Sequence, residues 1–276
     1  MDRTIIPNGL QEESLNVRKY FSQLVNQQNI TLAYVTGRHL ELVKEAITEY
    51  DLPTPAFAIT DVGTKIYQNN NNAWLNLQSW EKEIDTDWNG HSTDFIKKIC
   101  KPIQHLTLQE ASKQNEHKLS FYIPVTCNTA ILEFSIRQML KQHDIDASII
   151  CSIDETENIG LLDILPKNAT KLHGIQFLQQ HLNINSSETL FAGDSGNDIP
   201  VLSSPIPSVL VANASNEVKQ KALADAKQNN TEESLYYATG NLNNMNGNYC
   251  AGVLEGFVHF HPNFETTLQS IINGME

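Results

Sequence analysis

Cysteine is scarce in this sequence, and so are the patterns of secreted or membrane-embedded proteins. The 276 residues hold four cysteines, and no two of them form a Cys-x-x-Cys pair. This spacing is typical of reduced, mostly buried thiols, and it excludes a disulfide framework or a cysteine zinc site. No run of about 18 apolar residues and no charged-then-apolar signal pattern is present. We therefore expect a cytoplasmic protein with no membrane contact. The cysteines are Cys100, Cys127, Cys151 and Cys250.

Basic residues are also few. The chain has 19 lysines and arginines against 32 aspartates and glutamates, which gives a formal net charge of -13. This balance argues against nucleic acid or an anionic membrane surface as a partner. An anionic substrate would have to be bound by a local group of cations or by a metal. The length allows one large domain or two smaller ones.

The first sixty residues alternate between helical and strand patterns. Apolar residues at helical spacing predict a helix that begins near Val17. The apolar runs 30–35 and 56–60 predict two buried strands, and a second helix begins between them near His39. This β-α-β order predicts a parallel sheet.

The middle of the chain has a different character. Residues 68–72 are Gln-Asn-Asn-Asn-Asn, which predicts a turn. Three tryptophans follow within fifteen positions, and they indicate either the core of a small domain or a sugar-facing surface. Strands are predicted at 118–123 and 147–152 with a helix between them, so we interpret 78–160 as an α+β insert. The tryptophans are Trp74, Trp80 and Trp88.

The α/β pattern returns after the insert. Its predicted elements are a strand at 161–166, a helix from Lys171, a strand at 189–192, a strand at 208–213, a helix at 216–226 before a polar break at 227–231, and a last helix at 253–260. The fold class is therefore α/β, with a parallel-sheet core made of residues 1–77 and 161–276 and the insert at 78–160.

Two carboxylates follow the apolar strand that ends near residue 193. The stretch is Gly193-Asp194-Ser195-Gly196-Asn197-Asp198. Ligands of open α/β sheets bind at the carboxyl ends of strands, where paired carboxylates suit magnesium. The alternative is an ordinary turn, because Asp, Asn and Gly dominate turns for conformational reasons.

Three other polar groups occupy comparable positions in the predicted core. They are Asp2-Arg3-Thr4, Thr36-Gly37-Arg38 and Lys171. Together with the acid pair they form the set that metal-assisted phosphoryl transfer requires: metal-binding acids, hydroxyls and a cation for phosphate.

These motifs resemble those of haloacid dehalogenase (HAD) superfamily phosphatases with a type-two, Cof-like cap. The four superfamily motifs occur in order as the tail of Asp-x-Asp-x-Thr at 2–4, Thr36, Lys171 and 193–198. A narrower resemblance, to the sucrose-phosphate phosphatase family, rests on the segments 2–9, 36–38, 59–64, 117–121 and 246–249. The resemblance implies an HAD-like Rossmannoid core, with the insert as a cap that determines substrate specificity.

The resemblance also implies a Mg²⁺-dependent phosphomonoesterase that works through an aspartyl-phosphate. Asp2 would be the general acid and base, and its main-chain carbonyl would contact the metal. Thr36 and Lys171 would hold the transferring phosphoryl group. Asp194 would be a direct metal ligand and Asp198 a supporting one.

The remaining candidates are substrate-side residues implied by the same resemblance. They are Gly37, Arg38, Thr64, Lys118 and Asn197. Lys167 competes with Lys171 for the phosphate, and the spacing after Pro166 favours Lys171.

The first aspartate of the Asp-x-Asp motif is missing, because Met1 stands at the middle position. Either the protein has lost catalysis and binds a sugar phosphate, or the printed start lies downstream of the true one. We favour the second interpretation, because the residues before the motif would form a central strand of a buried sheet. The chain as printed is expected to be inactive, because the missing first aspartate is the nucleophile that attacks phosphorus.

Three functional hypotheses follow. The first is hydrolysis of sucrose 6-phosphate. The second is hydrolysis of another compatible-solute phosphate, such as glucosylglycerol phosphate, mannosyl-3-phosphoglycerate or trehalose phosphate. The third is a non-catalytic partner of a sucrose-phosphate synthase.

Overall fold

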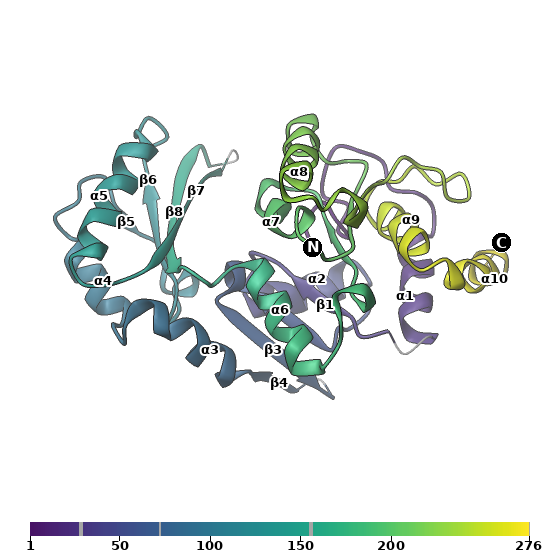
Figure 1. Cartoon of the computed structure of the whole chain (residues 1–276), viewed down its shortest axis with the longest axis horizontal. Helices are drawn as coiled ribbons and strands as arrows, with labels where there is room; N and C mark the ends of the chain where they lie inside the picture. The colour runs from purple at the N-terminus through teal and green to yellow at the C-terminus, as the bar shows by residue number, and fades with distance from the viewer. Residues whose placement is uncertain (28–29, 72, 155–156, 276) are drawn as a thin grey trace. The chain divides into compact units, whose positions relative to one another are not determined.

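The computed structural model describes residues 1–27, 30–71, 73–154 and 157–275, and the chain divides into two compact units. The first unit contains Met1–Ala58 and Ile175–Glu276, and the second contains Ile59–Gly174 (Figure 1). No helix within the described ranges is long and apolar enough to cross a membrane.

A parallel three-stranded sheet lies in the first unit, with the order β11-β10-β9. Ser208 pairs with Phe191 on one side and with Leu235 on the other, so all three strands run in the same direction. A parallel sheet in the core, as expected for the α/β fold class, is therefore confirmed for these three strands. The strands are β9 (Phe191–Gly193), β10 (Ser208–Leu210) and β11 (Leu235–Tyr237), and the unit also contains β1 (Ala33–Val35) and the start of β2 (Phe57–Thr60).

Helices make up most of the rest of the first unit. They are α1 (Val17–Gln27), α2 (Leu40–Glu49), α7 (Ile199–Leu202), α8 (Asn216–Asn229), α9 (Cys250–Phe260) and α10 (Glu265–Asn273), with short 3-10 turns at Ser186–Glu188, Gly196–Asp198, Glu232–Ser234 and Pro262–Phe264. Helix α6 (Lys171–Leu182) begins in the second unit and continues into the first. The helices predicted near Val17, near His39 and from Lys171 are confirmed, because their apolar faces are regular.

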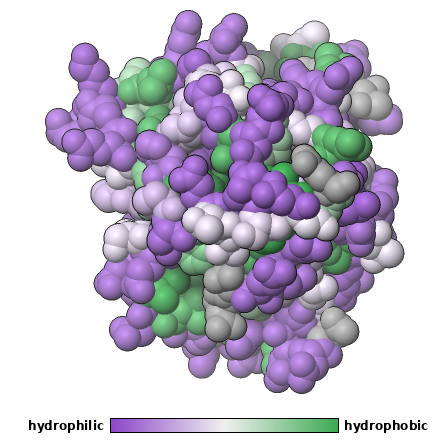
Figure 2. All heavy atoms as spheres, turned by 90° about the vertical axis from the view of Figure 1, so that its right-hand side faces the viewer, coloured by the Kyte–Doolittle hydropathy of each residue, from purple (hydrophilic) through white to green (hydrophobic). Residues whose placement is uncertain are grey.

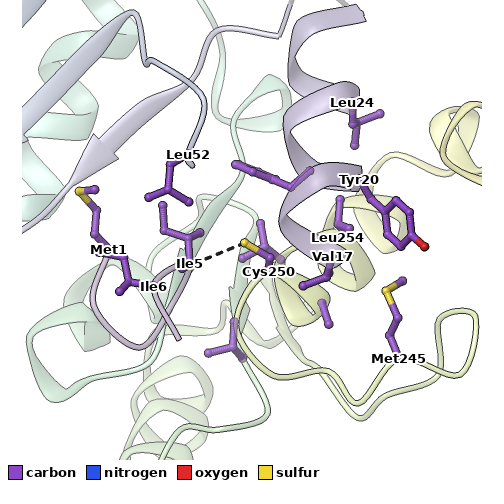
Figure 3. Close-up of a cluster of buried hydrophobic side chains, with 14 of the residues drawn as sticks. Met1, Ile5, Ile6, Val17, Tyr20, Leu24, Leu52, Met245, Cys250 and Leu254 are labelled. Carbon is purple, nitrogen blue, oxygen red and sulfur yellow. Dashed lines mark hydrogen bonds between the residues drawn. The ribbon is translucent and has the colours of Figure 1, made fainter. Parts of the chain in front are cut away.

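The core of the first unit joins the two ends of the chain. Figure 3 shows Met1, Ile5 and Ile6 among side chains of α1 and α9. The thiol of Cys250, the first residue of α9, donates to the main-chain oxygen of Ile5 at 3.6 Å. The segment that begins with Met1 is therefore part of the core. On the surface that carries α9 and α10, apolar side chains lie in small separate patches among hydrophilic ones (Figure 2).

The second unit is built on an antiparallel sheet with the order β5-β6-β8-β7. Helices α4 and α5 pack against it and share one apolar core with it (Figure 1). The strands are β5 (Thr107–Leu108), β6 (Leu119–Ile123), β7 (Ala147–Asp154) and β8 (Ile159–Pro166), and the helices are α4 (Thr93–Cys100) and α5 (Thr129–Lys141), with a 3-10 turn at Ala111–Lys113.

A second set of elements in this unit precedes that sheet in the chain. Strands β3 (Lys65–Asn70) and β4 (Ala73–Asn76) form an antiparallel hairpin. A 3-10 turn, η1 (Asp61–Gly63), comes before the hairpin, and α3 (Gln78–Asp85) with the 3-10 turn η2 (Thr86–Trp88) comes after it. Trp80 and Trp88 are fully buried, which favours the core interpretation of the tryptophans.

Four sequence predictions need correction. The strand at 161–166 was taken as the return to the core, whereas β8 pairs with β6 and β7 of the antiparallel sheet, and its alternate residues are buried. Residues 68–70 belong to β3, and Asn72 lies outside the described residues. The strand predicted at 208–213 ends at Leu210. Helix α8 extends past Ala226 into the expected break at 227–231. It ends at Asn229, because Asn230 adopts the left-handed conformation.

Candidate active site

The carboxylate of Asp2 is held by a guanidinium group from the segment between β1 and α2. Arg38 Nε donates to Asp2 Oδ2 at 2.9 Å, and Nη2 donates to Oδ1 at 2.6 Å. Asn8 Nδ2 also donates to Oδ1, at 2.8 Å. Burial raises the pKa of Asp2, but the hydrogen bonds and the charge of Arg38 outweigh it, so the net pKa lies below the ordinary value.

Thr4 joins the N-terminal segment to the acidic loop after β9. Its hydroxyl donates to Asp194 Oδ1 at 2.8 Å and lies 3.3 Å from the main-chain oxygen of Asp2. Thr4 and Asp194 are both buried. Burial raises the pKa of Asp194, the hydrogen bond from Thr4 opposes this rise, and the charge of Asp198 adds to it.

Asp198 holds the loop together from inside. Its Oδ2 accepts from the main-chain nitrogens of Asp194 and Ser195 at 3.1 and 3.0 Å, and from Ser195 Oγ at 2.8 Å. A Cβ at position 193 would lie 2.6 Å from Asp198 Cγ, so only glycine fits beside this carboxylate. Asp198 therefore holds the turn, as the turn interpretation of the motif predicts, and Asp194 lies at the start of that turn.

Asn213 is a site residue that the sequence analysis missed. Its Nδ2 donates to the main-chain oxygen of Arg3 at 2.6 Å, and its Oδ1 accepts from the main-chain nitrogen of Tyr249 at 2.8 Å. Arg3 Nη2 donates back to the Asn213 main-chain oxygen at 3.2 Å. These bonds hold Arg3 in a left-handed conformation with φ 54° between Asp2 and Thr4. The available signal was a polar residue at the end of an apolar run, as at Asp194.

The other predicted residues of the first unit surround this group less closely. Thr36 is buried, and its Oγ1 accepts from the main-chain nitrogen of Arg38 at 3.2 Å. Gly37 and Asn197 are exposed. Within this unit the structure brings together Asp2, Thr4, Arg38, Asp194 and Asp198.

Three predicted residues belong to the second unit. Thr64 is fully buried, and its hydroxyl donates to the main-chain oxygen of Asp61 at 3.0 Å and accepts from Asn115 Nδ2 at 2.9 Å. Lys118 is buried, with only 7% of its surface exposed. Lys171 is the first residue of α6, so its ammonium group is carried at the beginning of that helix.

The acids of the first unit provide oxygen donors for a hard cation. Among the described residues, no group of three or more His, Cys, Asp or Glu side chains could hold a metal ion. A carboxylate oxygen of Asp194 and the main-chain oxygen of Asp2 nevertheless contact the same hydroxyl of Thr4. Oxygen donors of this kind are suited to Mg²⁺, which keeps several water ligands.

The fold and the acidic loop after β9 define an HAD-like hydrolase. A crystal structure of the sucrose-phosphatase from Synechocystis sp. PCC6803, in complex with sucrose and phosphate, superposes with a TM-score of 0.66 at 27% identity, covering 88% of this chain and 92% of that one. A protein of Nitrosococcus oceani, named only provisionally as a HAD-like hydrolase, is 48% identical over 95% of this chain and 70% of its own length.

The family model of Sucrose-6F-phosphate phosphohydrolase matches residues 1–261. The chain belongs to this family of phosphoric monoester hydrolases, which confirms the resemblance drawn from the motifs. Sucrose-phosphatase 2 of Nicotiana tabacum is 31% identical over 74% of this chain, and the match spans 46% of the tobacco protein. The chain thus covers about half the length of that relative.

Proposed function

We propose that the chain is a magnesium-dependent sugar-phosphate phosphatase whose substrate is sucrose 6-phosphate. The contact of the Thr4 hydroxyl with Asp194, at 2.8 Å, carries the proposal, because it joins segments 190 residues apart. The main-chain oxygen of Asp2 lies 3.3 Å from the same hydroxyl. Membership of the family and the similarity to an enzyme crystallised with sucrose and phosphate support this substrate class.

Asp194 and the main-chain oxygen of Asp2 are the proposed direct ligands of Mg²⁺, with Asp198 in support. Asp194 is a buried carboxylate with a raised pKa, so a divalent cation beside it would favour its charged form. When bound, Mg²⁺ neutralises charge on the phosphate oxygens. Asp198 acts by holding the Asp194–Ser195 turn.

Asp2 is the proposed proton donor to the leaving sugar oxygen and the later acceptor of a proton from water. Arg38 holds both carboxylate oxygens of Asp2, which fixes the direction of the carboxylate. Thr36 and Lys171 are proposed to hold the transferring phosphoryl group. Gly37, Arg38, Asn197, Thr64 and Lys118 are the proposed substrate contacts. The proposed cap is the insert that begins at residue 78, and it extends past the predicted end at 160 to the end of β8 at Pro166.

The first test measures binding by the 276-residue chain. Calorimetry with sucrose 6-phosphate in magnesium chloride is expected to show one site, and Asp194→Asn is expected to weaken it about tenfold or more, because a metal ligand is lost. Asp225→Asn is the matched control, since Asp225 lies on α8 in an ion pair with Lys221. Equal affinity of wild type and Asp194→Asn contradicts the proposed metal site.

The second test measures phosphate release. Release is measured for the chain with an Asp placed directly before Met1, which completes the Asp-x-Asp motif. We expect release, with sucrose 6-phosphate hydrolysed faster than glucosylglycerol, mannosylglycerate or trehalose phosphates. If one of these three compounds is hydrolysed faster than sucrose 6-phosphate, that compound is the substrate instead. No release from any of them contradicts the function.

A further inference from the structure

The segment of α3 and η2, residues 78–88, places an acidic side chain at every second position from 81 to 87. Each acid contacts a different partner within the second unit. Glu81 pairs with the ammonium of Lys65. Glu83 Oε1 lies 3.3 Å from His173 Nε2, and Asp85 Oδ1 lies 3.2 Å from His117 Nε2. The carboxylate of Asp87 accepts from the main-chain nitrogen and from Nδ2 of Asn168, at 2.6 and 2.8 Å.

Each of these four partners stands next to or near a predicted site residue in the sequence. Lys65 directly follows Thr64, and His117 directly precedes Lys118. The other two partners, Asn168 and His173, flank Lys171, which begins α6. One short acidic segment therefore contacts the chain neighbours of all three predicted site residues that belong to this unit: Thr64, Lys118 and Lys171.

Two buried tryptophans anchor the same segment. Trp80 Nε1 donates to the main-chain oxygen of Gly63 at 3.0 Å, and its ring meets His173 edge-on with centroids 5.1 Å apart. The ring of Trp88 lies against His117 at 5.8 Å. Both tryptophans are fully buried, so the segment cannot shift without disturbing the packing. Figure 1 shows α3 between the β3–β4 hairpin and α4.

The backbone before Thr64 is held in an unfavourable conformation. Asp61, Val62 and Gly63 have φ values of 51°, 62° and 102°, and the left-handed conformation is unfavourable for a β-branched residue such as valine. Such a conformation persists only where its surroundings fix it. Here the hydrogen bond from Trp80 to Gly63 is one of those constraints.

Thr64 and Lys118 are also tied to each other. Asn115 Nδ2 donates to Thr64 Oγ1 at 2.9 Å, and the main chain of Asn115 exchanges two hydrogen bonds with Lys118 at 3.1 and 3.2 Å. Glu116 adds a second contact to Lys65, at 2.5 Å. Thr64 and Lys118 are therefore linked through Asn115, and Glu81 and Asp85 contact the chain neighbours of both.

We propose that residues 78–88 are a positioning element that fixes Thr64, Lys118 and Lys171 relative to one another for binding of the sugar phosphate. Its acids touch the neighbours of these residues and not the substrate. The inference rests on the proposed function, because that proposal makes Thr64 and Lys118 substrate contacts and gives Lys171 the phosphoryl group to hold. It adds Glu81, Glu83, Asp85 and Asp87 as positioning residues.

The test changes Glu83 and Asp87, the two acids whose partners, His173 and Asn168, stand on either side of Lys171 in the sequence. The double variant Glu83→Gln/Asp87→Asn keeps the side-chain sizes and removes both charges. The control is Asp94→Asn/Asp144→Asn, which removes two exposed charges from the same unit. Dissociation constants for sucrose 6-phosphate and for inorganic phosphate are measured in magnesium chloride, alongside hydrogen exchange and thermal unfolding.

We expect the double variant to bind both ligands about three- to tenfold more weakly, because contacts of partly exposed carboxylates contribute modest free energies. Amide exchange in residues 167–174 is expected to rise, whereas the unfolding temperature shifts by about 2 °C or less. The control is expected to match wild type in all three measurements. The charge-preserving variant Glu83→Asp/Asp87→Glu is expected to recover part of the lost affinity.

The outcomes separate the two proposals. If wild type binds and the double variant binds equally well, the positioning element is overturned while the proposed function stands. If exchange rises and affinity does not fall, the segment has only a structural role, and the inference is again overturned. If wild type binds neither ligand, the proposed function fails, and the inference fails with it.

Discussion

At the scale of single residues, the site depends on polar side chains that fix main-chain atoms. Asn213 is buried, and its amide bridges the Arg3 oxygen and the Tyr249 nitrogen. An unmade bond at such a position costs about 1–3 kcal/mol for each buried group. The direction of Asp2 and Thr4 on either side of Arg3 therefore depends on a residue that need not touch substrate.

The pairing of Arg38 with Asp2 gives a prediction in pH. Replacing Arg38 with alanine removes the cation and two hydrogen bonds, so burial is left as the largest influence and the pKa of Asp2 is expected to rise. Carbon NMR titration of the aspartate carboxyls, without added magnesium, measures the change. Arg137→Ala is the control, since Arg137 pairs with Glu133 on α5 in the other unit.

The sign of the linked stability follows from the same shift. The folded-state pKa of Asp2 lies below its unfolded value, so its contribution to stability is present above the unfolded pKa and is lost as the pH falls through the folded pKa. Arg38→Ala is expected to abolish this acid-side loss. An Asp2 titration that is the same in wild type and variant contradicts the assignment to Arg38.

At the scale of elements, α9 lies close to the parallel sheet because it carries glycine at the contact. A Cβ at Gly256 would lie 2.5 Å from the Cβ of Val209 in the middle of β10. Val209 is fully buried, and its branched side chain cannot move aside. The separation of helix and sheet is thus determined by the absence of one methyl group.

Gly256→Ala is accordingly expected to destabilise the protein by about 1–3 kcal/mol, the usual cost of overpacking a core. Urea unfolding measures it. Gly196→Ala is the matched control, because a Cβ there meets nothing within 4 Å, and we expect a change of about 0.5 kcal/mol or less. Equal unfolding midpoints for the two variants argue against a close approach of α9.

The elements also show what the sequence could and could not predict. Helices such as α1 and α6 were found because an apolar face repeats along them regardless of their surroundings. The position of β8 was missed because its apolar run at 161–166 was taken for the return of the parallel-sheet core. Gly160, Leu162 and Ile164 are buried and alternate with less buried residues, a pattern typical of a sheet with one buried face, and only the end of the strand, Leu165 and Pro166, is buried without alternation.

The site was predictable where its residues stand in short motifs at the ends of strands. Asp194 and Asp198 stand together in the sequence, so their loop was recognised. Asn213 acts on Arg3 across 210 positions, and Asp87 acts on Asn168 across 81. Spacing in the sequence carries no information about such pairs, because only the fold determines which segments meet.

At the scale of the whole molecule, the first unit is closed by contacts between the beginning and the end of the chain. Met1, Ile5 and Ile6 share a core with Cys250 and Leu254 (Figure 3). The proposed magnesium ligands lie on the same segments or next to them, since Asp2 precedes Ile5 and Thr4 contacts Asp194. A cation bound there would oppose separation of the N-terminal segment from the acidic loop.

Magnesium is therefore expected to raise the unfolding temperature of the first unit. A ligand at one hundred times its dissociation constant adds about 2.7 kcal/mol, which corresponds to about 5–10 °C for a unit of this size. Calorimetry with magnesium chloride, against sodium chloride of equal ionic strength, measures the shift. Asp194→Asn should lose it, because the amide oxygen still accepts from Thr4 but carries no charge for the cation, whereas Asp225→Asn should keep it. If magnesium stabilises Asp194→Asn as much as wild type, the cation binds elsewhere. The contacts of Asp2 and Asp194 with the Thr4 hydroxyl then serve only to join the N-terminal segment to the loop after β9.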